Sequence, residues 1–206
     1  MAAGPGSGAA HDRTRVGRVF LIRHAETEWS ASGRHTGRTD LPLTDAGRRA
    51  ARRLGELLAG ERFGTVLTSP MSRARETCEL AGLGGGARER AELLEWDYGA
   101  YEGLTTPEIR AQRPGWLLWR DGCPQGETAE DVAARVDPVV AELDGGEADS
   151  AVFAHGHVLR VLGARWLGLP GSDGGLLALS TASISVLGHE RETRVIWRWN
   201  QTVKTG

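Results

Sequence analysis

Five side chains of this 206-residue chain have the types and the spacing that phosphoryl chemistry needs. Each follows or closes an apolar run that is expected to form a β-strand. They are Arg23, His24, Arg73, Glu95 and His155. The carboxyl ends of strands in a parallel sheet share one edge, and ligands of such sheets bind there. We therefore expect two arginines, two or three histidines (His157 being the third) and one carboxylate to converge at one site.

A phosphate monoester at that edge would meet complementary groups. Arg23 and Arg73 offer bidentate, charge-assisted donors for the phosphate oxygens. A neutral imidazole can attack phosphorus to form a phosphohistidine, and a second, protonated histidine can stabilise charge on the equatorial oxygens. Protonated Glu95 can donate its proton to the leaving alkoxide and then accept one from the attacking water. Because the arginines and the second histidine neutralise the phosphate, this chemistry needs no metal ion.

Each of these side chains also has an ordinary alternative. A single arginine, glutamate or histidine in this position is more often a surface or structural residue. His155 and His157 could form half of a zinc site, but the sequence offers no third ligand with metal-like spacing. The phosphate interpretation rests on the four segments together, at four successive strand ends of one pattern.

The elements that must position these residues alternate between strands and helices. Strands are predicted at 17–23, 65–70, 92–99 and 150–156, helices at 41–60, 71–82, 128–143 and 157–169, and a terminal hairpin at 182–190 and 193–200. This alternation predicts an α/β fold of three layers, α/β/α, with a mainly parallel central sheet.

Capping residues and apolar periodicity define the predicted start of two of the helices and the buried face of the first. Thr44 is the expected N-cap of the first helix, and its inner face is predicted to hold Leu54, Leu57 and Leu58. Thr128 followed by Asp131 is typical of a helix start. Between the elements, residues 98–126 are predicted to form an inserted helical segment, here called the flap, within a single domain over 17–206. Residues 1–16 are expected to be a disordered tail.

Composition excludes several classes of protein. The net charge is −2, so no overall basic field would attract nucleic acid. Cys78 and Cys123 match no metal or disulfide pattern and are expected to be reduced thiols. No apolar run reaches transmembrane length, and the N-terminus lacks the apolar core of a signal peptide. We therefore expect a cytoplasmic protein with no membrane and no nucleic-acid partner.

Four segments carry a resemblance to a known family. "LIRHAETEWS", "SPMSRARET", "LLEWDYGAYEG" and "VFAHGHVLR" resemble the signature segments of the histidine phosphatase superfamily, the phosphoglycerate-mutase-like proteins. The resemblance covers nearly all of the chain after Gly17. It implies that His24 is the phosphorylated nucleophile, that Arg23, Arg73 and His155 form the phosphate pocket, and that Glu95 is the proton donor. It also places Ser30 and Thr36 in a substrate loop facing the phosphate.

The sequence departs from the family pattern in ways that indicate a branch. Ala25 stands where the family usually has glycine, which suits a negative φ and would otherwise strain the loop. Ser30 stands where mutases typically have asparagine. The arginines that could hold phosphoglycerate are spread out, at positions 110, 113 and 120. The pattern favours a branch of broad acid phosphatases and a sugar-bisphosphate phosphatase.

The substrate is then expected to be a small phosphorylated metabolite, with no cofactor. Arg34, Arg38 and Arg160 are candidates for holding a distant second phosphate, although surface roles fit them equally. His35 and His157 are expected to support the site from behind it. Phosphate or sulfate could occupy the site, and the chain could be a monomer or a homodimer. The alternatives are a cofactor-dependent phosphoglycerate mutase and, from a different class, a weakly catalytic module that binds a phospho-ligand.

The tryptophans bear on how the flap meets a substrate. Trp116 is predicted to be a core residue, whereas Trp96 could be core or could cover the substrate's carbon skeleton.

Overall fold

The computed structural model describes residues 16–202, so all but the last residue of the predicted N-terminal tail lies outside the described part. A sheet of six strands lies at the centre, in the order β3-β2-β4-β1-β5-β6. The strands are β1 (Val19–Arg23), β2 (Thr65–Thr68), β3 (Arg88–Glu89), β4 (Ser150–Ala154), β5 (Ser183–Glu190) and β6 (Thr193–Thr202). The β5–β6 hairpin confirms the predicted terminal hairpin.

The sheet is parallel over its first four strands and antiparallel at the hairpin. β4 pairs in parallel with both β1 and β2, and β2 pairs in parallel with β3. β5 runs antiparallel to β1 and to β6. The predicted α/β fold with a mainly parallel sheet is therefore confirmed.

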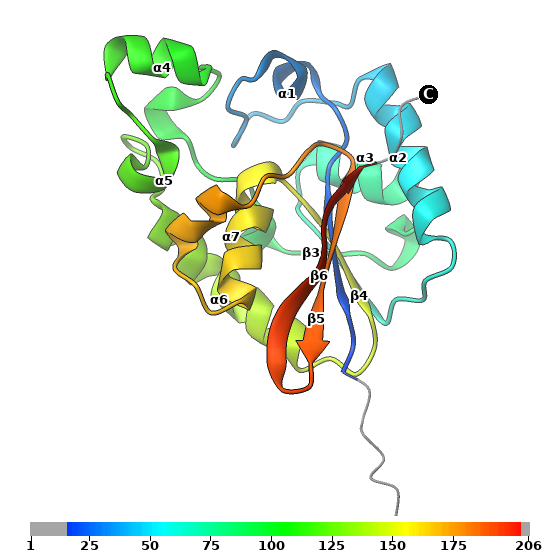
Figure 1. Cartoon of the computed structure of the whole chain (residues 1–206). Coiled ribbons are helices and arrows are strands. Elements are labelled where there is room, and N and C mark those ends of the chain that lie inside the picture. The colour runs from blue at the N-terminus through cyan, green and yellow to red at the C-terminus, as the bar shows by residue number, and fades with distance from the viewer. Residues whose placement is uncertain (1–15, 203–206) are drawn as a thin grey trace, which may run out of the picture.

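Helices cover both faces of the sheet. The α-helices are α1 (Glu28–Ser32), α2 (Asp45–Leu58), α3 (Ser72–Leu80), α4 (Thr106–Gln112), α5 (Leu118–Asp121), α6 (Ala129–Asp144) and α7 (Gly156–Trp166). Figure 1 shows α2 and α3 on one side of the sheet and α6 and α7 on the other. Each face has its own buried apolar cluster, so the three-layer arrangement is the one predicted.

Local sequence accounts for where α2 begins and which face it buries. The Thr44 side chain accepts a hydrogen bond from Gly47 N (3.0 Å), as expected of an N-cap. Leu54 and Leu58 are buried, but Leu57 is 47% exposed, so its prediction as an inner residue is wrong. The buried stripe follows positions 47, 51, 54 and 58, and a 3.6-residue period places position 57 at its edge.

The predicted strand at 92–99 is also wrong. A short 3-10 helix (Ala91–Leu93) and an irregular segment follow β3 there. The backbone of this segment is satisfied by side chains instead of a neighbouring strand. Trp96 N donates to its neighbour Glu95 (2.9 Å), and Asp97 N donates to Glu127 (2.8 Å). Glu95 is therefore held by a loop beyond the sheet edge.

The 98–126 segment contains α4 and α5 and lies beyond the α7 side of the sheet, at the upper left of Figure 1. Capping boxes begin α4 at Thr105 and α6 at Thr128, the second as predicted. Trp116 is buried in the apolar core, as expected, and Trp96 is buried there too. Within residues 16–202, no helix is long and apolar enough to cross a membrane.

Candidate active site

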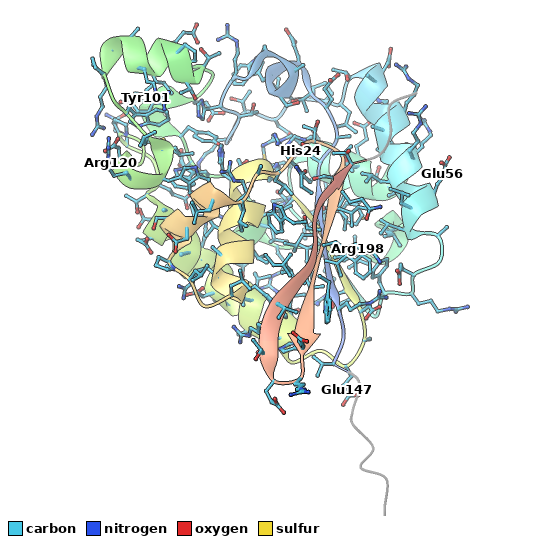
Figure 2. All side chains as sticks on the ribbon, viewed as in Figure 1. His24, Glu56, Tyr101, Arg120, Glu147 and Arg198 are labelled. Carbon is cyan, nitrogen blue, oxygen red and sulfur yellow. The ribbon has the colours of Figure 1, made fainter. Side chains whose placement is uncertain are left out.

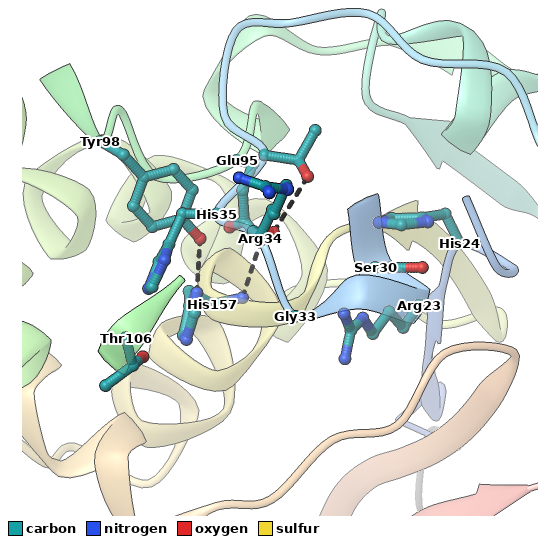
Figure 3. A pocket seen from close by; sticks show the side chains of 11 residues that line it. Arg23, His24, Ser30, Gly33, Arg34, His35, Glu95, Tyr98, Thr106 and His157 are labelled. Atoms are coloured by element: carbon teal, nitrogen blue, oxygen red, sulfur yellow. Dashed lines mark hydrogen bonds between the residues drawn. The ribbon is translucent and has the colours of Figure 1, made fainter. Parts of the chain in front are cut away.

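A polar cavity of about 230 Å³ opens at the carboxyl ends of β1 and β4. Figure 2 shows His24 at this end of the strands. The cavity is lined by Arg23, His24, Ser30, Gly33, Arg34, His35, Thr36, Glu95, Tyr98, Thr106 and His157. In the close view of Figure 3, Arg23 and His24 lie at one end of the cavity, and Tyr98, His157 and Thr106 lie at the other.

His24 is fixed by the backbone that follows β1. Its amide donates to Ala154 O (2.9 Å), which continues the β1–β4 pairing by one residue. Its ring Nδ1 lies 2.7 Å from Ala25 O. A carbonyl oxygen only accepts, so Nδ1 carries the proton and Nε2 keeps a free lone pair. Burial, together with the positive charges of Arg23 and Arg73, lowers the pKa of His24 well below its ordinary value, so the imidazole is neutral.

The Arg23 guanidinium lies beside His24 with unused donor capacity. Its Nη1 donates to Leu179 O (2.5 Å), whereas its buried Nε has no hydrogen-bond partner among the described residues. A Cβ on Gly156 would lie 3.1 Å from the guanidinium carbon, so the glycine leaves the space that Arg23 fills. A buried cationic donor without an acceptor is costly, and an anion at this end of the cavity would satisfy it.

Arg73 and His155 lie behind the cavity wall and contact each other. Arg73 is completely buried at the start of α3, and its Nε donates to His155 Nδ1 (3.1 Å). His155 Nε2 must then carry the proton, which it donates to Ser69 Oγ (2.8 Å). Burial, followed by the charge of Arg73, lowers the pKa of His155 well below its ordinary value. His155 is thus neutral here, and the expectation of a protonated second histidine is wrong for this structure.

The remaining donors of Arg73 organise the loop that closes over the site. They contact the carbonyl oxygens of Thr36 (3.2 Å), Gly37 (3.0 Å) and Thr39 (3.0 Å). From the other side, the Glu102 carboxylate accepts from Gly37 N and Thr39 N, both at 3.0 Å. Sequence reasoning missed Glu102, which follows Glu95 by seven residues within the same quoted segment.

Glu95 is held by the first turn of α7. Its two carboxylate oxygens accept from His157 N (3.0 Å) and Val158 N (2.9 Å), which are free donors at a helix N-terminus. The side chain is 8% exposed and faces the cavity. A loop residue is thereby fixed in orientation by the helix that follows β4.

Arg135 and Glu127 hold the backbone of the loop that carries Glu95. Arg135 on α6 donates to the carbonyl oxygens of Glu92 (2.6 Å) and Glu95 (3.2 Å). The same guanidinium forms an ion pair with Glu127 (2.7 Å), which also accepts from Asp97 N. The sequence pattern gave no sign of this arrangement, because Arg135 is one of many arginines on amphipathic helices.

The far end of the cavity is built from residues that the sequence analysis placed elsewhere or did not single out. His35 and His157 line the cavity directly, so the expectation that both lie behind it is wrong. Tyr98 and Thr106 line it as well. The Tyr98 hydroxyl lies 2.5 Å from His157 Nδ1. The position of Tyr98, three residues after Glu95, is the one signal that could have indicated it.

The remaining predicted residues divide between the cavity and its surroundings. Ser30 and Thr36 both line the cavity, and the Ser30 hydroxyl also closes the capping box of α1 with Thr27. Of the three candidates for a distant phosphate, Arg34 lines the cavity. Arg38 instead pairs with Asp97, and Arg160 lies over the Trp119 ring with its donors on carbonyls of Gly174 and Gly175.

Ala25 and the cysteines are accommodated without strain. Ala25 is buried and is not among the described residues with a positive φ, so its Cβ costs no backbone strain. Its amide donates to Thr77 Oγ1 (3.1 Å). Cys78 and Cys123 are free and buried, as predicted, and burial raises the pKa of both thiols to about 12.

The sheet order, with an arginine and a histidine side by side at the tip of β1, is the arrangement of the phosphoglycerate-mutase-like fold. The family model "Histidine phosphatase superfamily (branch 1)" matches residues 19–202. The chain belongs to this superfamily, and the resemblance of the four segments is confirmed.

Two relatives place the chain near phosphatases. An acid phosphatase of Mycobacterium tuberculosis is 45% identical over 182 residues, covering 86% of this chain and 89% of the relative. A sedoheptulose 1,7-bisphosphatase of Saccharomyces cerevisiae is 38% identical over 185 residues, covering 74% of this chain and 68% of the relative. Phosphatase chemistry is the activity class that these similarities support.

Solved structures of related proteins support the same assignment to the histidine phosphatase superfamily. The product of a Mycobacterium tuberculosis open reading frame superposes with a TM-score of 0.86 and 43% identity, over 91% of this chain and 99% of that one. A mycobacterial glucosyl-3-phosphoglycerate phosphatase, solved with inorganic phosphate, gives a TM-score of 0.77 at 31% identity, over 90% and 98% of the two chains. A small phosphorylated compound is therefore the kind of ligand consistent with this site.

Proposed function

We propose that the protein hydrolyses phosphate monoesters through a phosphohistidine on His24. The observation that carries the proposal is the ring orientation of His24. Its Nδ1 proton is engaged by Ala25 O (2.7 Å), which leaves the Nε2 lone pair free for attack. The pKa of this histidine is lowered by burial and by two arginines, so the nucleophile needs no base to deprotonate it.

The first half-reaction transfers the phosphoryl group to the protein. His24 Nε2 forms a bond to phosphorus while the bond from phosphorus to the ester oxygen breaks. Glu95, in its protonated form, donates a proton to the departing oxygen and becomes a carboxylate. The two amides at the start of α7 that contact Glu95 fix its orientation and are positioned to stabilise that carboxylate.

The second half-reaction releases inorganic phosphate. The Glu95 carboxylate accepts a proton from a water molecule, the water oxygen bonds to phosphorus, and the N–P bond to His24 breaks. Glu95 is thus protonated again and His24 is again neutral. The chemistry uses only side chains already in the site, so the proposed enzyme is metal-independent and takes no cofactor.

The phosphoryl oxygens need donors in both steps. Arg23 supplies its unpartnered Nε and its remaining guanidinium hydrogens. Arg73 uses four of its five N–H groups on His155 and on loop carbonyls, so its contribution is one N–H and the position of its neighbours. The His155 Nε2 proton, which Ser69 accepts here, would turn to a phosphoryl oxygen. Ser30 and Thr36 border the same space.

The test is phosphate release from an aryl phosphate, 3-phosphoglycerate and a sugar bisphosphate, comparing the wild type with His24→Ala. We expect hydrolysis by the wild type and a loss of roughly 10⁴-fold or more in the variant, the scale on which a nucleophile matters. His189→Asn, a histidine that pairs with Asp144 outside the cavity, is the matched control and should keep most of the activity.

The outcomes separate the alternatives. Isomerisation of phosphoglycerate that requires a bisphosphate primer, with little hydrolysis, would identify a mutase. Tight phosphate binding without any turnover would identify a binding module. Equal hydrolysis by wild type and His24→Ala would refute the phosphohistidine route.

A further inference from the structure

The end of the cavity opposite His24 has chemistry that the phosphoryl steps do not use. His35, His157 and Thr106 line it, and the Tyr98 hydroxyl borders it (Figure 3). The two imidazole rings are nearly parallel, with centroids 6.2 Å apart and planes 10° apart. This end of the cavity would receive whatever part of a substrate lies beyond its phosphate.

The protonation of His35 is fixed by a backbone carbonyl. Its Nδ1 lies 2.7 Å from Leu104 O, which only accepts, so Nδ1 carries the proton. Burial is the main cause that lowers the pKa of His35, so the ring is neutral and Nε2 is a lone-pair acceptor. No described residue donates a hydrogen bond to that Nε2.

The ring of His157 is held by a tyrosine. The hydroxyl of buried Tyr98 lies 2.5 Å from His157 Nδ1, and each of these two groups can donate to the other. Burial, followed by the charge of Arg160, lowers the pKa of His157 well below its ordinary value, and the ring is neutral. His157 Nε2 is therefore a donor when Tyr98 donates to Nδ1 and an acceptor when Nδ1 carries the hydrogen, and in both forms it has no hydrogen-bond partner among the described residues.

Two uncharged imidazoles therefore line the same space, with an acceptor at His35 Nε2 and a nitrogen that can donate or accept at His157 Nε2. A hydroxyl group donates one hydrogen bond and accepts others, so it can satisfy His35 Nε2 and a His157 N–H together, and a second hydroxyl can donate to His157 Nε2 where that nitrogen is the acceptor. An ionised second phosphate or a carboxylate only accepts, so it would meet a lone pair at His35 and could pair only with a His157 N–H. Arg34 on the lining already donates to Gly103 O (2.7 Å) and lies 3.7 Å from Glu108, and Arg160, whose charge acts on His157, donates to the carbonyl oxygens of Gly174 and Gly175.

We propose that His35 and His157 select a hydroxylated, uncharged carbon skeleton, so that the substrate is the phosphate monoester of a polyol or sugar. This inference rests on the proposed phosphatase function and names its substrate class. Leu104 and Tyr98 act as positioning residues, because Leu104 O sets which nitrogen of His35 carries the proton and the Tyr98 hydroxyl holds the ring of His157. The hydroxyl of Thr106 adds a further donor and acceptor at the same end.

The test compares xylitol 5-phosphate with n-pentyl phosphate, which has the same chain length and no hydroxyl groups. The wild type should prefer xylitol 5-phosphate in kcat/KM by at least about tenfold. His35→Phe keeps a ring of similar size but removes the acceptor, and it should reduce that preference by about tenfold. His189→Phe makes the same replacement outside the cavity and should leave the preference as in the wild type.

The results distinguish this inference from the function on which it rests. If the wild type hydrolyses both esters without preferring the polyol, the inference is wrong and the phosphatase function stands. The same holds if His35→Phe and His189→Phe show equal preferences. If neither ester nor any other phosphomonoester is hydrolysed, the proposed function itself fails. Should His35→Phe not fold, the wild-type preference alone decides.

Discussion

The two ends of the cavity are built in different ways. At one end, Arg23 and His24 follow directly from β1, and pairing between β1 and β4 fixes their backbone. At the other end, Glu95, Tyr98 and His35 lie on loops, and each is oriented by a hydrogen bond to a distant part of the chain. The first end depends on the sheet, whereas the second depends on contacts between segments far apart in sequence.

This difference assigns different tasks to the two ends. The strand-borne end presents charges and a lone pair whose positions are set by the most regular part of the fold, which suits the phosphoryl group common to all substrates. The loop-borne end can change its lining without disturbing the sheet, which suits selection among carbon skeletons. Glu95 lies on a loop, like the residues of the second end, but its proposed role as proton donor belongs to the phosphoryl chemistry of the first end. It therefore links the two ends.

After the loss of the nucleophile His24, the largest effect should come from removing the proton that Glu95 donates. In Glu95→Gln, kcat/KM for an alkyl phosphate should fall by roughly 10²–10⁴-fold, because an alkoxide needs a proton to leave. For 4-nitrophenyl phosphate the loss should be much smaller, because its leaving group is a weak base. Steady-state kinetics with both esters provide the measurement. Equal losses would show that Glu95 matters for structure alone.

A smaller effect is expected on the pH dependence of folding stability, to which histidines from both ends of the cavity contribute. Burial lowers the pKa of four histidines at the site: His24, His35, His155 and His157. Below pH of about 6.5 the unfolded chain binds protons that the folded chain does not, so stability must fall as the pH falls. Each histidine contributes up to about 1.4 kcal/mol per pH unit.

Urea unfolding between pH 7.5 and pH 5 measures this dependence, in a window above the range where carboxylates titrate. His157→Phe removes one of the four groups and should flatten the dependence. A midpoint that stays constant or rises as the pH falls would contradict the neutral state of the buried histidines.

The smallest effect is expected at the strand-borne end. Ala25 has no strained φ and is buried among apolar neighbours, so Ala25→Gly should change kcat/KM by less than about threefold. Stability should drop slightly, since glycine gains more freedom on unfolding. Activity assays beside a urea titration test both points. A gain in activity of tenfold or more would mean that the methyl group of Ala25 obstructs the phosphate. The pairing of β1 with β4 would then not be sufficient to determine the geometry of this end of the cavity.

Local sequence was sufficient to predict the position of a residue that directly follows a regular strand or begins a helix. The apolar run of β1 predicted where Arg23 and His24 lie, and Thr44 and Thr128 predicted two helix starts. The prediction failed where long-range contacts decide the backbone. Residues 92–99 have strand-like composition, yet Arg135, Glu127 and the start of α7 hold them as a loop.

The sequence by itself determined the α/β alternation, the residues available for phosphoryl chemistry and the family to which they belong. Only the tertiary structure decided which nitrogen of His24 and of His155 is free, because that depends on the atom that each ring meets in the folded chain. Ala25 O frees Nε2 of His24, and Arg73 Nε places a proton on Nε2 of His155. Burial then keeps these rings neutral, and burial is a property of packing that no local pattern of residues specifies.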